Sequence, residues 1–338
     1  MNEPRTNEHR EQRNQHPDRV TVDWTMQTMP SQEDVARIDR LVEDIIPPNE
    51  PDRVTVDWTM QTMPSEEDVA RIDRLVEDII PPNEVEERQS PLVLLHGVTL
   101  SGRIWQDVVP LLSEHHDVHA PTLLGHRGGP AIQRRPARVS DVVDAAERYL
   151  DEHGLARPHL AGNSLGGWVA IELARRGRAA SVCAFSPAGF WWDSASNEQV
   201  LRKIRWARAQ ERVTRPIAPL MLRSAVVRRL GLREGACHGD RLTAARVLEL
   251  MDDCIDCPFM DYYCPDEQAE PLDPLPCPVT LAWAQFDRLA PAATHGRTAR
   301  ERLPGATWVL LPGVGNVAMV DDPDLVSRTI MAVTGVAA

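Results

Sequence analysis

The sequence predicts an α/β fold built on a mostly parallel, doubly wound sheet. Two observations carry this prediction. From residue 91 onward, short apolar stretches alternate with helical stretches, as expected for a parallel sheet covered on both faces. The apolar content of 42% over 338 residues is also sufficient for a sizeable core. Strands are expected at residues 91–95, 118–122, 158–162, 180–185, 278–283 and 307–311, and helices at 105–113, 139–153, 168–175, 291–303 and 323–333.

One stretch interrupts this alternation. Residues 190–275 contain helical segments and no convincing core strand, so they are expected to form a helical lid inserted between two strands. Open α/β sheets bind their ligands at the carboxyl ends of the strands, where such a lid would lie. The lid is locally basic, because residues 198–234 hold ten Arg or Lys and three acidic side chains.

Composition excludes several classes of protein. No apolar run approaches about 18 residues, which argues against a membrane-spanning helix, and the charged N-terminus lacks the apolar core of a secretory signal. The net charge of −13 argues against nucleic-acid binding. We therefore expect a cytoplasmic protein that neither spans a membrane nor binds nucleic acid. No P-loop and no GxGxxG after a strand is present, so no cofactor is indicated, and the oligomeric state is left open.

The six cysteines are expected to be free thiols in a reducing compartment. Cys254 and Cys257 have CxxC spacing, with His238 and Cys264 as further candidate ligands. A zinc site would need a second well-spaced pair, which is missing. Buried structural thiols are therefore favoured and no metal is expected.

The acidity belongs to the N-terminal region. Residues 1–90 hold 22 acidic and 10 basic side chains, whereas residues 91–338 hold 28 and 27. After an expected disordered tail (1–16), residues 51–84 repeat residues 17–50 with one change, Gln32 to Glu66. Each 34-residue copy has a short β-rich stretch, a Pro-Ser break and an amphipathic helix, which favours a duplicated extension. A further hypothesis is that this acidic segment docks on the basic lid and gates a pocket.

A GxSxG motif carries the chemistry. Gly162 to Gly166 follows an apolar strand and precedes a helix, which is the context of a nucleophile elbow presenting Ser164. The glycines permit the sharp turn, and the helix N-terminus favours negative charge there. His96 and Gly97 end the first strand, and the backbone N–H groups of Val98 and Leu165 are the candidate oxyanion-hole donors.

Five blocks in this order, LLHGVTLSGRIW, APTLLGHRGGP, AGNSLGGWVA, LAWAQFDRLAP and LPGVGNVAMVDDP, resemble the α/β-hydrolase superfamily. The resemblance covers residues 91–338 and is greatest to single-domain serine esterases and lipase-like enzymes. It implies an α/β-hydrolase-type sheet, with Ser164 as nucleophile and Asp287 as the acid of a catalytic triad.

The sequence departs from this family at the base. The resemblance implies a histidine where the chain has Asn316, and often proline where it has Ala318. Asparagine has no proton affinity near neutral pH and cannot act as a general base. His96 is expected to be a structural hydrogen-bonding group, and neither His126 nor His295 is favoured as a substitute base.

Two functions therefore compete. One is a serine hydrolase that acts on a small ester or related acyl substrate through Ser164, with activity impaired by the missing histidine. The other is a catalytically inactive pseudo-hydrolase that binds a ligand or partner. Six aromatic residues of the lid are expected either to line an apolar acyl site or to belong to the core: Trp191, Trp192, Trp206, Phe259, Tyr262 and Tyr263.

Overall fold

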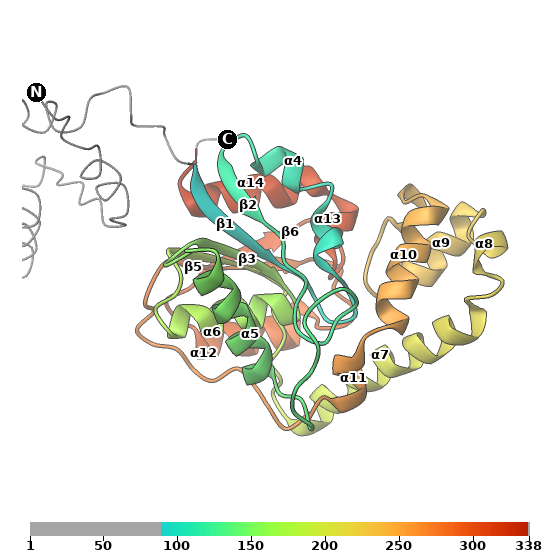
Figure 1. Ribbon diagram of the computed structural model, residues 1–338, viewed down its shortest axis with the longest axis horizontal. Helices are drawn as coiled ribbons and strands as arrows, with labels where there is room; N and C mark the ends of the chain where they lie inside the picture. The colour runs from blue at the N-terminus through green and yellow to red at the C-terminus, as the bar shows by residue number, and fades with distance from the viewer. Residues whose placement is uncertain (1–88, 337–338) are drawn as a thin grey trace, which may run out of the picture. The chain divides into compact units, whose positions relative to one another are not determined.

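The computed structural model describes residues 89–336, and the prediction of an α/β fold is confirmed (Figure 1). Six strands form one sheet in the order β2-β1-β3-β4-β5-β6, and every neighbouring pair is parallel. The expected tail (1–16) and the two repeat copies (17–50 and 51–84) lie outside the described residues. The strands are β1 (Ser90–Leu95), β2 (His116–His119), β3 (His159–Asn163), β4 (Ser181–Phe185), β5 (Val279–Ala284) and β6 (Thr307–Leu311).

Helices cover both faces of the sheet, which makes it doubly wound. Successive side chains of a strand point to opposite faces, so Val93 and Leu95 pack into one core while Leu92 and Leu94 pack into the other. The first core includes α5 (Val139–Glu152), α6 (Leu165–Arg175) and α12 (Arg297–Arg302). The second includes α4 (Val109–Leu112), α13 (Ala318–Asp321) and α14 (Pro323–Thr334).

The boundaries of several elements differ from the predictions. The helix expected over 105–113 is a 3-10 turn (Gly102–Trp105) followed by α4, because Pro110 lacks an N–H and its ring would clash with the preceding helical turn. The strand expected at 118–122 is β2, which pairs with β1 from residue 116 and ends before Pro121. The helix expected over 291–303 begins as a π-helical turn (Ala292–Gly296).

The chain between β4 and β5 forms a helical insertion that extends away from the sheet (Figure 1). It contains α7 (Ser194–Thr214), α8 (Ala218–Met221), α9 (Ala225–Leu232), α10 (Ala244–Ile255) and α11 (Pro258–Tyr262). Within the described residues, no helix is both long enough and apolar enough to cross a membrane.

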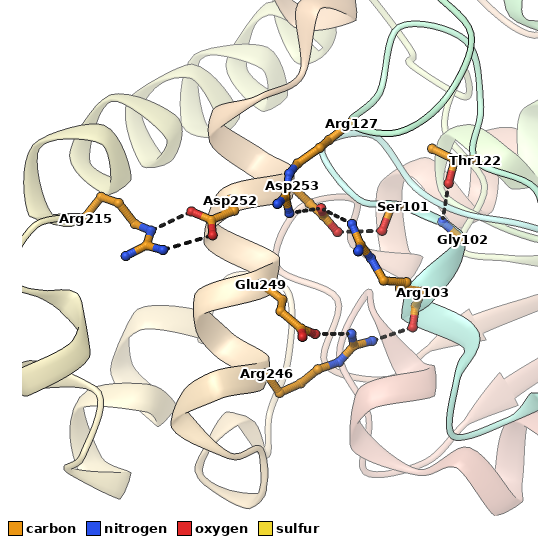
Figure 2. Close-up of polar contacts among 10 residues, drawn as sticks. All are labelled: Ser101, Gly102, Arg103, Thr122, Arg127, Arg215, Arg246, Glu249, Asp252 and Asp253. Atoms are coloured by element: carbon orange, nitrogen blue, oxygen red, sulfur yellow. Dashed lines mark hydrogen bonds and ion pairs between the residues drawn. The ribbon is translucent and has the colours of Figure 1, made fainter.

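Asp253 on α10 attaches this insertion to the sheet loops (Figure 2). Its buried carboxylate accepts a hydrogen bond from the hydroxyl of Ser101 at 2.5 Å. It also pairs with Arg103 at 3.3 Å and Arg127 at 3.1 Å, from the loops that follow β1 and β2. On the other side of α10, Arg215 at the end of α7 pairs with Asp252. The base of the insertion is therefore fixed to the loops at the carboxyl edge of the sheet.

Candidate active site

Ser164 lies in the sharp turn between β3 and α6. Its backbone has φ 51° and ψ −112°, a conformation that residues other than glycine rarely adopt. Its N–H donates to the carbonyl of Phe185 at 2.9 Å, and its own carbonyl accepts from Ala188 at 2.9 Å, so the end of β4 holds the strained residue in place. A Cβ on Gly162 would lie 2.2 Å from the carbonyl oxygen of Gly166, so the turn requires glycine there.

The loop after β1 lies directly against this turn. A Cβ on Gly97 would lie 3.4 Å from Cβ of Ser164. Within residues 89–336, the backbone N–H groups of Val98 and of Leu165 have no hydrogen-bond partner. The N–H of Leu165 belongs to the first turn of α6, where the helix dipole adds positive potential. Both unpartnered groups thus lie beside the serine turn, Leu165 directly after Ser164 and Val98 in the loop that approaches it.

His96 is held on both ring nitrogens. Its Nδ1 contacts the carbonyl of Gly97 at 2.8 Å and its Nε2 accepts from the N–H of Leu123 at 2.9 Å. These partners identify the neutral tautomer that carries the proton on Nδ1. Burial holds the pKa of His96 well below its usual value. The ring therefore connects the loops after β1 and β2 and has no nitrogen left for proton transfer.

Asp287 and Asn316 are directly bonded in the loops after β5 and β6. The amide Nδ2 of Asn316 donates to Oδ2 of Asp287 at 2.8 Å, and both residues are buried. The other oxygen of Asp287 accepts the N–H groups of Leu289 and Ala290 at 2.9 and 2.8 Å. Burial raises the pKa of Asp287, and these hydrogen bonds oppose that rise.

Asn163 connects this pair to the turn of the serine. Its Nδ2 donates to the carbonyl of Asn316 at 2.7 Å, so the residue before Ser164 fixes the backbone at Asn316. Ser164 and Asn316 line the same cavity, whereas Asp287 lies behind Asn316. The structure thus brings the predicted residues Ser164, Asp287 and Asn316 to one edge of the sheet.

The remaining histidines lie elsewhere, and none lines the cavity in the described part of the chain. His126 stacks on Phe259 and contacts the carbonyl of Leu124, and burial lowers its pKa to about 4. His295 packs edge-on against Trp191 and Trp192 in the π-helical turn, and its pKa is also lowered to about 4 by burial.

The cavity has a volume of about 930 Å³ and lies between the serine turn and the helical insertion. Its wall is mainly apolar, with contributions from α7, α8, α9 and α10. Four of the six aromatic residues singled out above line it: Trp191, Trp206, Phe259 and Tyr263. Trp192 and Tyr262 do not. A cavity of this size and polarity fits an extended apolar chain.

Glu211 on α7 is a lining residue that sequence reasoning missed. One oxygen of its carboxyl group, Oε2, is buried without a hydrogen-bond partner within the described structure. The side chain lies beside the thiol of Cys254, which in turn contacts Thr99, the residue after Val98. Burial raises the pKa of Glu211 to about 7. In the sequence, Glu211 is one of three acidic residues in the basic stretch 198–234, and nothing in its local pattern marks it as a cavity residue.

Glu211→Gln is expected to stabilise the protein at pH 8 by about 1–2 kcal/mol, a gain limited by the partial exposure of Glu211. The pKa of Glu211 is near 4.5 when unfolded and about 7 when folded. Stability from the protonated form is therefore complete below 4.5 and is lost as the pH rises through 7. Thermal melts at pH 5 and pH 8 check this, with Glu198→Gln on the exposed side of α7 as control. Equal shifts at both pH values would contradict it.

The chain is similar to several known hydrolases. The sequence pattern that defines the alpha/beta hydrolase family matches residues 92–329 of the chain. The epoxide hydrolase EphH of Mycobacterium tuberculosis is 32% identical over 56% of this chain and 91% of its own length. A pimeloyl-[acyl-carrier protein] methyl ester esterase of Pectobacterium atrosepticum is 25% identical over 72% of this chain and 93% of its own. The enol-lactonase of Burkholderia xenovorans shares the fold, with a TM-score of 0.59 and 18% identity over 74% of this chain and 93% of that one.

Proposed function

Since the chain belongs to the alpha/beta hydrolase family, we propose that it is a serine hydrolase of apolar acyl esters with low turnover at neutral pH. Ser164 is the nucleophile, and Asn316 stands where the reaction needs a base. The observation that carries this proposal is the strained turn that presents Ser164 to the cavity between two unpartnered N–H groups. The apolar wall supports an acyl chain as the group recognised.

In the first step, Oγ of Ser164 attacks the carbonyl carbon of the ester. The carbonyl oxygen becomes an oxyanion and accepts the N–H groups of Val98 and Leu165. The carbon–oxygen bond to the alcohol then breaks, and the departing alkoxide takes a proton from water. A water molecule hydrolyses the remaining acyl-serine to the free acid and restores the hydroxyl of Ser164. The proton of Ser164 has no side-chain acceptor at Asn316, so it passes to hydroxide or water. Turnover is therefore expected to be slow at pH 7 and to rise with pH.

A second candidate is a ligand-binding protein without turnover. The hydrogen bond between Nδ2 of Asn316 and Asp287 favours it, because both oxygens of Asp287 already accept hydrogen bonds and the amide of Asn316 has no proton affinity near neutral pH. The same apolar cavity would then hold a fatty acid or another apolar ligand.

A fluorophosphonate probe and p-nitrophenyl butyrate together separate the two candidates. The proposed hydrolase is labelled, and it turns over the ester faster as the pH rises from 7 to 9. Ser164→Ala abolishes both signals, while Ser113→Ala on the exposed end of α4 leaves both intact. Turnover that survives Ser164→Ala would overturn the hydrolase. Fatty-acid binding without labelling or turnover would instead identify the ligand-binding protein.

A further inference from the structure

The outer helices of the insertion expose an unusual number of large apolar side chains. Of the large hydrophobic residues exposed in the described structure, most fall within one short stretch: Trp206, Val213, Ile217, Leu220, Met221, Val226 and Leu230. Val213 is 80% exposed and Leu220 is 69% exposed. We call these seven residues the apolar cluster. Its concentration on α7, α8, α9 and the turns between them is typical of a surface that contacts another apolar phase.

Three residues of this cluster also line the cavity. Trp206 of α7, Met221 of α8 and Leu230 of α9 are exposed to solvent and at the same time form part of the cavity wall. Because they come from three different helices and meet at one cavity, they form its rim. The edge of the cavity therefore includes part of the apolar cluster, beside the exposed Arg202.

The same helices carry excess positive charge. Residues 198–234 hold ten basic and three acidic side chains. The side chains of Arg202, Arg205 and Arg223 are exposed and make no hydrogen bond or ion pair to any described residue. Of the acids, Glu234 is partly neutralised by Lys203 at 3.6 Å and Arg233 at 3.8 Å. Four other basic residues of this stretch pair with acids outside it: Arg208 and Arg212 with Asp261, Arg215 with Asp252, and Arg229 with Asp240. The positive charge that is not compensated on these helices therefore comes mainly from Arg202, Arg205 and Arg223.

The insertion is held to the sheet domain at more than one point, since the N–H groups of Cys237 and His238, which follow α9, donate to the carboxylate of Asp321 on α13 at 2.8 and 2.6 Å. Asp253 fixes α10 to the sheet loops, and Arg208 pairs with Asp261 to join α7 to α11 (Figure 2 shows the first of these). The helices α8 and α9 lie at the end of the insertion that is remote from the sheet (Figure 1). The apolar cluster is therefore carried outward on a firmly held base.

We propose that the outer face of α7, α8 and α9 docks on an anionic lipid surface. Apolar side chains insert at the headgroup boundary, and the three free guanidinium groups bind lipid phosphates. A second copy of this chain is disfavoured as the occupant, because the free guanidinium groups of the two copies would repel each other. Docking places the rim of the cavity in the lipid, so that an acyl chain enters without crossing water. This last step rests on the proposed function, whereas docking itself does not.

The test uses the full chain and two kinds of vesicle, pure phosphatidylcholine and phosphatidylcholine with 30% phosphatidylglycerol. Co-sedimentation is expected to show at least tenfold tighter binding to the anionic vesicles, weakened by salt. The double variant Leu220→Ser with Val226→Ser, outside the cavity wall, should weaken this binding at least tenfold. So should replacement of Arg202, Arg205 and Arg223 by Gln. The matched control, Phe286→Ser with Leu310→Ser, removes exposed apolar residues outside the insertion and should bind as the parent does.

Several outcomes would overturn the docking proposal. One is that the protein binds no vesicles, and another is that it binds both kinds of vesicle equally. A third is that the control variant loses as much vesicle binding as Leu220→Ser with Val226→Ser does. Self-association that Leu220→Ser with Val226→Ser abolishes, without vesicle binding, would identify a second copy as the occupant. Ser164→Ala separates the two proposals, because it should bind vesicles normally. An inactive protein that still binds anionic vesicles leaves docking intact and overturns only the hydrolase.

Discussion

Asn316→His is expected to raise the turnover of p-nitrophenyl butyrate at pH 7 by at least about 100-fold, the lower end of what a positioned general base contributes. Asp287 already accepts a hydrogen bond from the side chain of residue 316 at 2.8 Å. An imidazole Nδ1–H at this position could donate to the same carboxylate oxygen. Its Nε2 would then be free to accept the proton of Ser164, because both residues line the same cavity.

The backbone around Asn316 makes this substitution informative. Its carbonyl accepts from Asn163 at 2.7 Å, a bond that does not depend on the side chain of residue 316. The loop should therefore keep its position in the variant. Asn316→Ala serves as a matched control, since it removes the amide without supplying a base, and is expected to show no gain. The gain must also vanish in Asn316→His with Ser164→Ala. A gain that persists there, or none in a folded variant, would show that Asn316 is not at the base position.

Much of the fold could be predicted because its signals are local. An apolar stretch followed by Gly-Asn-Ser-Leu-Gly and a helix predicts both β3 and the turn at Ser164, and the structure has Ser164 at φ 51° there. The helix predicted over 105–113 ends within one residue of α4, which ends at Leu112. Its first part was wrong, because Pro110 restricts the helix to the four residues of α4. The short helix α13 was missed, since one helical turn leaves no periodic pattern to detect.

The cavity could not be predicted in the same way. Its wall combines α7, α8, α9 and α10 with the loop after β1 and the turn at Ser164, which lie far earlier in the chain. Sequence spacing on one helix shows which residues share a face, but does not show which distant segment that face will meet. Glu211 illustrates the difference, because its raised pKa arises from burial between elements rather than from its neighbours in sequence. The bond between Asp287 and Asn316 likewise joins two loops and depends on the order of β5 and β6 in the sheet.

The second large effect is expected at Gly166, where Ala should destabilise the protein by about 3 kcal/mol or more. A Cβ at this position would lie 2.2 Å from the carbonyl oxygen of Leu95, at the end of β1. Leu95 is held by the pairing of β1 with β3, and Gly166 lies in the first turn of α6, so neither group can move away cheaply. Helix propensity has the opposite sign, because Ala in place of Gly within α6 should stabilise it by about 1 kcal/mol. The steric cost of the added Cβ exceeds the gain in helix propensity, so Gly166→Ala is expected to be less stable than the parent protein.

Gly231→Ala is the matched control for this effect. Gly231 is also helical, in α9, but beyond its chain neighbours and the backbone of its own helix, no atom of the described residues lies within 4 Å of the position that its Cβ would take. The substitution there should be neutral or stabilising by up to about 1 kcal/mol. Urea unfolding followed by circular dichroism measures both variants on one scale. If Gly166→Ala were as stable as Gly231→Ala, β1 and α6 could separate at no cost. The close approach that fixes Ser164 beside the loop of Val98 would then not constrain the site.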